Sequence, residues 1–291
     1  MAERAFLVCA TPRSGSTLVC QALRRTGVAG RPEEYFEALL HSGRPRRPEE
    51  YFKGLDDTSI ADHLGECAAE DDAYVPSGLW SRKEYDRYLE WAIETGTTPN
   101  GVFSAKLMWG YFGDFLSLLR NIRRYRDVPL ADLLPTVFPD LTYVRVVRAN
   151  KIRQAVSLWK AVQTASWREE DPRLDPSLRD GSPPLRFHYR AIAHLLDRIL
   201  FEEAEWDAFF EHCGVRPLLV LYENFAADPH TSTVSILDRL GLEAPPDVRI
   251  EPRMRPQSDG INDDWVRRFS ELRLGTEFDL VPAVAPVETP S

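Results

Sequence analysis

A polar turn, Thr11–Thr17 (TPRSGST), directly follows the apolar run Ala5–Ala10, which is typical of a strand buried on both faces. From Leu18 to Thr26 apolar residues recur at helical spacing, which predicts a helix. A strand, a polar turn and a helix in this order bind anions in α/β proteins, because the helix N-terminus presents unpaired N–H groups and a positive dipole end. Gly15 lets the backbone approach an anion closely. The side chains that can donate hydrogen bonds to it are Arg13, Ser14, Ser16 and Thr17. The alternative is a serine-rich helix N-terminus without a ligand.

The turn differs from a Walker A loop, which reads G-x-x-x-x-G-K-[ST], because Arg13 precedes Gly15 and no lysine follows it. No convincing acid for Mg²⁺ ends a predicted strand, and Glu223, after the last strand, is the nearest candidate. Both points argue against ATP-driven chemistry. A sulfuryl group carries less negative charge than a terminal phosphoryl group, so its transfer can dispense with a metal. The loop therefore fits sulfuryl transfer better.

Lys106 lies within the apolar run Val102–Trp109, although lysine is scarce in this chain. Burial of an unpaired ammonium group costs several kcal/mol, so we expect an anionic partner. We assign this lysine to a transition-state oxygen of a transferred group. The alternative is a strand-end lysine that extends to solvent.

The segment Arg31–Phe36 (RPEEYF) recurs as Arg47–Phe52. A positioned carboxylate can accept the proton of an attacking hydroxyl, and Glu34 is our candidate for this base. Glu33 and Glu50 are its rivals. The alternative is that both segments begin helices, where acidic residues favour the helix dipole.

Alternating strand and helix patterns predict an α/β fold of the P-loop type, with three layers and a parallel central sheet flanked by helices. One domain is expected over residues 1–275, with a loose, proline-rich tail over 276–291. The expected strands are Ala5–Ala10, Val28–Ala29, Val102–Trp109, Leu141–Val147 and Pro217–Tyr222. The expected helices are Leu18–Thr26, Ile60–Ala69, Tyr85–Thr95, Tyr111–Leu119, Ile152–Thr164, Leu185–Glu211 and Thr233–Leu240, with a short helix at most over Asn121–Pro139.

Ligands of an open parallel sheet bind outside the carboxyl ends of its strands, so the residues there should converge. In strand order these are Arg13–Thr17, Glu33 or Glu34, Lys106, Arg148 and Tyr222. A carboxylate among several cations is a plausible reaction centre.

Composition narrows the protein class. The formal charge of −9 argues against nucleic-acid binding, which needs a surplus of Lys and Arg. Four scattered cysteines without a CxxC pair predict free thiols, and the six histidines lack the spacing of metal ligands. No apolar run approaches the ~20 residues of a membrane span. We expect a cytoplasmic protein without a metal.

Several motifs resemble those of a known family. Thr11–Thr17 is similar to the 5′-phosphosulfate loop of sulfotransferases, P-[KR]-[ST]-G-[ST]-T. Three longer segments resemble the trehalose 2-sulfotransferase family of actinobacteria: Gly27–Phe36, Pro99–Trp109 and Gln154–Thr164. The similarity runs from about Phe6 to Arg268 and is interrupted near Asn121–Pro139.

The resemblance implies a sulfuryl donor, 3′-phosphoadenosine 5′-phosphosulfate, and a catalytic glutamate at Glu34. Arg148 and Ser157 resemble the pair that holds the donor's 3′-phosphate, and Arg255 is a weaker candidate for the same site. Many sulfotransferases have a catalytic histidine after the lysine, but Leu107 and Met108 follow Lys106 here. This departure supports a glutamate as base.

Our candidates for contact with the acceptor are Trp109, Trp159, Gln163 and Trp167, because aromatic faces and amides suit polyols. Core packing is the alternative, since Val156, Trp159 and Val162 lie at helical spacing. The acceptor is a small hydroxyl compound, either a trehalose-like sugar or a glycosylated or phenolic natural product. Two other functions stay open, namely a P-loop kinase-like phosphotransferase and a non-catalytic nucleotide-binding protein. The sequence leaves the oligomeric state open, with a homodimer among the allowed states.

Overall fold

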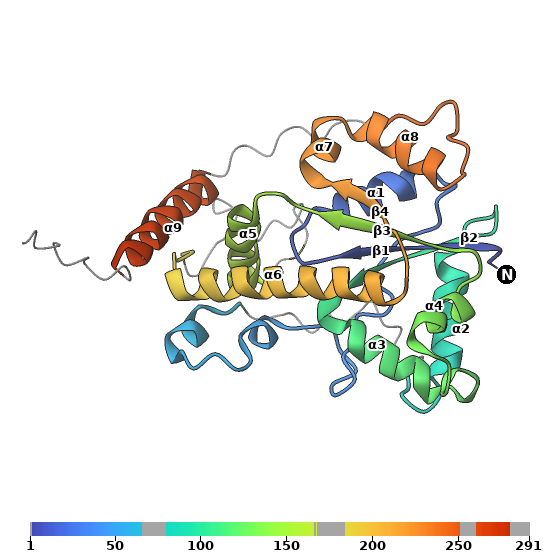
Figure 1. The fold of residues 1–291 in the computed structure, drawn as a ribbon, viewed down its shortest axis with the longest axis horizontal. Coiled ribbons are helices and arrows are strands. Elements are labelled where there is room, and N and C mark those ends of the chain that lie inside the picture. The colour runs from blue at the N-terminus through green and yellow to red at the C-terminus, as the bar shows by residue number, and fades with distance from the viewer. Residues whose placement is uncertain (1, 66–79, 166, 168–183, 251–259, 280–291) are drawn as a thin grey trace, which may run out of the picture.

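The central sheet contains parallel strands in the order β2-β1-β3-β4. The structure, a computed structural model, describes residues 2–65, 80–165, 167, 184–250 and 260–279, and only the backbone of 275–279 (Figure 1). The strands are β1 (Arg4–Ala10), β2 (Val102–Met108), β3 (Leu141–Val147) and β4 (Leu218–Leu221). Parallel pairing places all four carboxyl ends at one edge.

Helices cover both faces of this sheet, so the three-layer α/β prediction is confirmed (Figure 1). One face carries α1 (Ser16–Arg25), α7 (Tyr222–Ala227) and α8 (Pro229–Arg239). The other carries α2 (Tyr85–Gly96), α3 (Trp109–Asn121), α4 (Leu130–Val137) and the C-terminal half of α6 (Tyr189–His212). Short 3₁₀ helices cover Pro48–Phe52 (η1), Thr58–His63 (η2) and Arg123–Tyr125 (η4).

The period of two in β1 explains why its residues Ala5–Ala10 are all apolar. Leu7 and Cys9 enter the core beneath α3 and α6, whereas Phe6 and Val8 enter the core beneath α1 and α8. A strand buried on both faces fixes the position of the loop that follows it.

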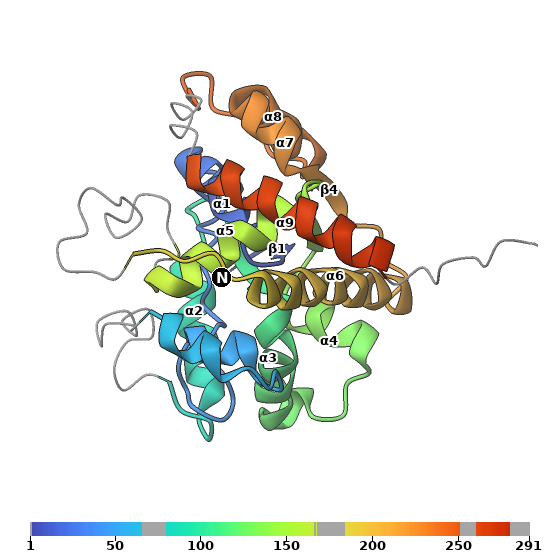
Figure 2. The same ribbon diagram turned by 90° about the vertical axis from the view of Figure 1, so that its left-hand side faces the viewer.

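A third apolar cluster joins α5 (Lys151–Thr164), the N-terminal half of α6 and α9 (Gly260–Asp279). Figure 2 shows α9 lying across α5. Trp265 and Phe269 of α9 are buried there against residues of α5 and α6. No helix within the described residues is long and apolar enough to cross a membrane.

The expected strand at Val28–Ala29 is wrong. Gly27 and Gly30 flank it with φ of 70° and 62°, so the chain turns there instead of extending. A single parallel bridge, between Glu33 and Ala105, forms further along. The acidic segment therefore lies beside β2 without a strand of its own.

Three helices begin at other residues than predicted, because a side chain caps the start of each. Asp57 accepts a hydrogen bond from Ser59 N, and a 3₁₀ helix over Thr58–His63 replaces the start of the expected helix Ile60–Ala69, of which residues 66–69 lie outside the described range. The His188 side chain caps α6, which begins at Tyr189 and not at Leu185. Asp228 caps α8, which begins at Pro229 and not at Thr233.

Three elements differ from expectation near the chemistry and at the C-terminus. Trp109 and Tyr222, expected at strand ends, each begin a helix instead. The helix α7 was not predicted, and neither was α9, which continues to Asp279 beyond the expected boundary at residue 275. The division of the chain into one domain and a tail stays a prediction.

Candidate functional site

The loop after β1 and the first turn of α1 contain hydrogen-bond donors suited to an anion. Arg13 and Gly15 have φ of 61° and 89°, and α1 begins immediately afterwards without a side-chain cap on its first turn. A Cβ at Gly15 would lie 2.0 Å from the ring of Tyr222, so no larger residue fits. Ser14 Oγ is fully buried without a hydrogen-bond partner among the described residues. This orphaned hydroxyl and the uncapped helix start fit an anionic ligand.

Side chains beneath the loop hold its backbone in place. Gln154 Nε2 donates to Thr11 Oγ1 at 2.9 Å and to the Pro12 carbonyl at 2.7 Å. Trp206 Nε1 donates to the carbonyl of Ala10 at 2.9 Å. These buried donors come from α5 and α6, so both helices determine where the loop lies.

Lys106 links the acidic segment to the loop. Its Nζ lies 2.6 Å from Glu34 Oε1 and donates to Thr17 Oγ1 at 3.1 Å. Burial lowers the pKa of this lysine, but Glu34 and other nearby acidic groups outweigh that effect, and the net pKa lies above its ordinary value. The buried ammonium therefore stays charged, with Glu34 as its anionic partner.

Tyr111, in the first turn of α3, fixes the other oxygen of the base candidate. Its hydroxyl is 3.1 Å from Glu34 Oε2 and 3.2 Å from the Lys106 carbonyl. Burial first, and then Glu34, raises the pKa of Tyr111 well above its usual range. The phenol thus stays protonated and can donate to the carboxylate. Sequence reasoning missed Tyr111, although its position five residues after Lys106 in a strand-to-helix junction was visible.

The rivals of Glu34 have different partners. The backbone of Glu33 accepts a hydrogen bond from Lys106 N at 2.9 Å, while its side chain pairs with Arg24. The two neighbouring carboxylates therefore have different cations as partners, Arg24 for Glu33 and Lys106 for Glu34. Glu50 Oε2 lies 2.6 Å from Lys53 Nζ, and its Oε1 lies 3.3 Å from His41 Nε2.

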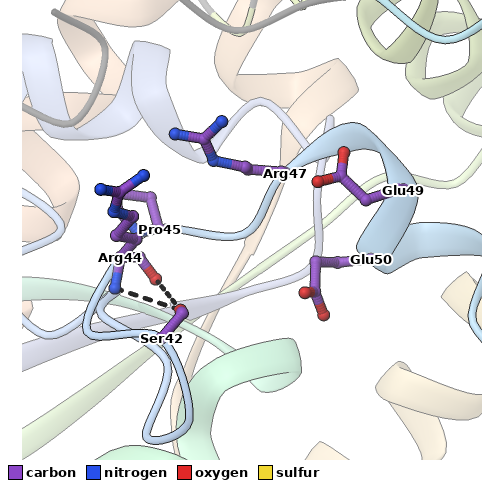
Figure 3. Close-up of a pocket in the computed structure, with 6 residues that line it drawn as sticks. All are labelled: Ser42, Arg44, Pro45, Arg47, Glu49 and Glu50. Atoms are coloured by element: carbon purple, nitrogen blue, oxygen red, sulfur yellow. Dashed lines mark hydrogen bonds between the residues drawn. The ribbon is translucent and has the colours of Figure 1, made fainter. Parts of the chain in front are cut away.

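Glu50 also lines a pocket of about 500 Å³ beside η1 (Figure 3). In that view Glu49 and Glu50 stand across from Arg44 and Arg47. Burial raises the pKa of Glu50, but hydrogen bonds from Lys53 and His41 outweigh it, and the net pKa is lowered. Glu50 thus pairs with two exposed side chains, whereas Glu34 pairs with the buried Lys106, which also contacts the anion loop.

The residues assigned to a 3′-phosphate lie together around Arg13. Arg13 Nε donates to Ser157 Oγ at 3.1 Å, and its Nη1 donates to the Trp167 carbonyl at 2.7 Å. Arg148 Nη1 donates to the Arg13 carbonyl at 3.2 Å, and its guanidinium lies 4.7 Å from the centre of the Tyr222 ring. The converging strand ends thus bring two arginines and a hydroxyl to one side of the loop.

Glu223 has a structural partner that the sequence did not reveal. Its carboxylate accepts hydrogen bonds from Ala149 N at 3.1 Å and Asn150 N at 3.3 Å. Burial raises its pKa, but these backbone donors outweigh burial and lower the net value. The acid considered for a metal therefore holds the turn that carries Arg148.

The remaining candidates are dispersed. Trp109 is partly buried and packs on Trp206, with ring centres 5.1 Å apart. The amide of Gln163 bonds to the backbone of Arg186 through both of its polar atoms, at 3.1 Å and 2.8 Å. Arg255 lies outside the described residues.

Comparison with known proteins agrees with the motifs. The model of the Stf0 sulphotransferase family matches residues 5–271. A trehalose 2-sulfotransferase of Mycolicibacterium smegmatis is 34% identical over 91% of this chain and 94% of its own length. One of Mycobacterium tuberculosis is 32% identical over 92% of this chain and 95% of its own length.

Two solved structures are similar over almost the whole chain. A sulfotransferase from Alicyclobacillus acidocaldarius has a TM-score of 0.41 and 14% identity, and covers 94% of this chain and 96% of that one. A sulfotransferase domain from the curacin biosynthetic pathway has a TM-score of 0.41 and 13% identity, and covers 99% of this chain and 94% of that one.

Proposed function

Because this chain belongs to the Stf0 sulphotransferase family, we propose that it transfers a sulfuryl group from 3′-phosphoadenosine 5′-phosphosulfate to a hydroxyl of a small acceptor, with Glu34 as general base. The observation that carries the proposal is the position of Lys106. Its ammonium contacts the Glu34 carboxylate and the Thr17 hydroxyl of the anion loop at 2.6 Å and 3.1 Å. A base candidate, a cation and an anion loop are thereby joined.

The donor binds along the carboxyl edge of the sheet. Its sulfated 5′ end occupies the loop, where Ser14 Oγ, the uncapped start of α1 and the Arg13 guanidinium supply donors. The loop residues concerned are Arg13, Ser14, Gly15, Ser16 and Thr17. Arg148 and Ser157 take the 3′-phosphate. Their proximity to Arg13 supports one continuous donor site, and a contribution from Arg255 stays a prediction.

Transfer proceeds by in-line attack of the acceptor oxygen on sulfur. The new O–S bond forms while the S–O bond to the donor phosphate breaks, and adenosine 3′,5′-bisphosphate leaves. Glu34 takes the hydroxyl proton late, because a carboxylate is a weak base towards an alcohol. Lys106 stabilises the charge that develops on the bridging oxygen. No metal ion takes part in this scheme, since Lys106 and Arg13 supply the positive charge.

A trehalose-like sugar is the acceptor class that the names of the relatives support. Contacts from Trp109 and Gln163 to the acceptor stay predictions, and so do a homodimer and a cytoplasmic setting. A phenolic or glycosylated natural product is the other acceptor class that the chemistry allows.

Thermal-shift measurements test the proposal against the phosphotransferase alternative. A ligand that binds only the folded state raises Tm by mass action, and about 100 times Kd corresponds to ~2.7 kcal/mol. We expect adenosine 3′,5′-bisphosphate to raise Tm in the presence of EDTA, and ATP with Mg²⁺ to have little effect. If ATP with Mg²⁺ raises Tm and the bisphosphate does not, the phosphotransferase alternative is favoured over sulfuryl transfer. Bisphosphate binding without turnover of any hydroxyl compound would favour a non-catalytic nucleotide-binding protein.

A further inference from the structure

The two copies of the RPEEYF segment place their tyrosines differently. In the first copy the hydroxyl of Tyr35 donates to the Arg31 carbonyl at 2.8 Å, within its own segment. In the second copy Tyr51 is buried, and its ring stacks on Trp167 at 5.4 Å. The Trp167 carbonyl in turn accepts the hydrogen bond from Arg13 of the donor loop. Tyr51 therefore packs against a residue that is tied to the donor site.

A buried ion pair fixes the phenol of Tyr51. The Arg46 guanidinium lies 5.0 Å from the centre of the Tyr51 ring, and its Nη1 lies 3.2 Å from Glu202 Oε1 on α6. Both side chains of this ion pair are less than a tenth exposed. Glu202 Oε2 is buried without a hydrogen-bond partner among the described residues. Burial of a charge pair costs free energy when one of its acceptor atoms has no hydrogen bond, so this Glu202 oxygen suits a further donor.

Arg46 also lies against the helix that carries the partner of the base. A Cβ built on Gly110 would lie 1.4 Å from Arg46 Nη2, so the guanidinium occupies the space of a side chain at the first turn of α3. The next residue, Tyr111, holds Glu34. The Arg46–Tyr51 pair is thereby adjacent to the reaction centre.

The charge state of Tyr51 suits a hydrogen-bond donor. Burial raises its pKa, Arg46 opposes that effect, and Glu202 and Glu34 add to it, for a value of about 12. Contacts place Tyr51 on the same side of the site, because Arg46 lies against both its ring and Gly110, and the neighbouring Tyr111 holds Glu34. An acceptor whose hydroxyl contacts Glu34 then has Tyr51 beside it.

We propose that Tyr51 binds a second hydroxyl of the acceptor, next to the one that Glu34 deprotonates, and so makes the enzyme selective for polyols over compounds with one hydroxyl. Arg46 and Glu202 act as positioning residues that hold the phenol. This inference rests on the proposed function and goes further, because it assigns the acceptor side of the site to the second copy of the repeat.

The test compares Tyr51→Phe with the matched variant Tyr35→Phe. The probe acceptors are trehalose, glucose and myo-inositol as polyols, and cyclohexanol and p-nitrophenol as compounds with one hydroxyl. With the best polyol we expect Tyr51→Phe to lose about tenfold in kcat/KM, mainly through KM, as for one lost hydrogen bond of about 1.4 kcal/mol. Turnover of the better mono-hydroxyl compound should change less than about twofold. Tyr35→Phe should leave the ratio between the two acceptors unchanged.

Gly110→Ala provides an independent route to the same effect, because its methyl group displaces the Arg46 guanidinium without removing a polar atom. We expect it to raise KM for the polyol, and to add little to Tyr51→Phe in the double variant, since both act on one contact. Arg46→Lys should restore part of the affinity that Arg46→Met loses.

Four outcomes would overturn the inference: an equal loss with both acceptor classes, no loss with either, additive effects of Gly110→Ala, or a wild-type enzyme that accepts no polyol of the panel. Calorimetric titration with adenosine 3′,5′-bisphosphate separates this failure from that of the proposed function. Wild type and Tyr51→Phe should bind it equally. A wild type that does not bind it refutes the donor site itself, and the inference with it.

Discussion

At the scale of single residues, the different roles proposed for Glu34 and Glu50 follow from their different partners. Glu34 contacts a buried ammonium and a buried phenol, whereas Glu50 contacts Lys53 and His41 at the surface. The two segments are identical over RPEEYF, so only the fold distinguishes the two carboxylates.

Glu34→Gln is expected to lower kcat by about 10² or more, because a general base contributes 10²–10⁴-fold. The bisphosphate should still bind, since the donor loop is intact. Glu50→Gln is the matched control and should change kcat less than about twofold, because Glu50 contacts Lys53 and His41 and not the Lys106 ammonium. Steady-state assays together with calorimetry measure both. A large loss in Glu50→Gln with a mild effect of Glu34→Gln would move the base to the second segment.

At the scale of elements, the helix α6 connects two apolar clusters and carries acidic residues between them. Its N-terminal half packs in the cluster with α5 and α9, and its C-terminal half packs beneath the sheet. Between the two halves stand Glu202 and Glu203, which face Arg46 and Lys151. These two acidic residues thus mark the part of the amphipathic helix α6 that lies beside the site.

The short helix α7 is the other element that shapes the donor site. Its first residue, Tyr222, packs against Gly15, and its second, Glu223, holds the backbone of Ala149 and Asn150. The folded-state pKa of Glu223 is lowered, so its stabilising effect is complete above the ordinary value of 4.5 and is lost as pH falls through the folded value.

Glu223→Gln is therefore expected to destabilise the protein by about 1 kcal/mol at pH 7, because hydrogen bonds to a charged acceptor are stronger than those to a neutral one. Urea unfolding of both proteins at steps below pH 5 should show the gap closing. Glu211→Gln, an exposed change on α6, is the control and should stay within about 0.5 kcal/mol at each pH. A gap that persists unchanged at the lowest pH would mean that the charge of Glu223 does not hold the turn.

How far the sequence predicts this molecule depends on whether a signal is local. The apolar run of β1 and the alternation of strands and helices are local, and they predicted the parallel sheet and the turn between β1 and α1 correctly. The motifs that indicated the family are local as well. The contacts of Tyr111, Tyr222 and Glu223 join segments far apart in sequence, so spacing did not reveal the partner of any of the three. Val28–Ala29 failed because two glycines with positive φ turn the chain there.

At the scale of the whole molecule, α9 connects the C-terminal part of the chain to the donor site. It was not predicted, although Ile261, Trp265 and Phe269 recur at helical spacing, and Trp265 and Phe269 are almost completely buried. They pack in the cluster that contains Ala155 and Leu158 of α5. Helix α5 also places Gln154 against the loop and Ser157 against Arg13. The third core therefore supports the helix that carries the residues proposed to bind the donor.

Phe269→Ala should accordingly destabilise the whole domain by about 3 kcal/mol, because it removes a buried ring and leaves a cavity. For a chain of this size we expect Tm to fall by roughly 6–12 °C. Leu274→Ala is the matched control, since that side chain is 57% exposed, and it should shift Tm by less than about 2 °C. Differential scanning fluorimetry measures both, with and without adenosine 3′,5′-bisphosphate. If α9 packs as a part of one cooperative domain, the bisphosphate raises the Tm of Phe269→Ala as much as that of wild type. A second, separate transition, or an unchanged Tm, would mean that α9 unfolds independently of the core that holds the donor site.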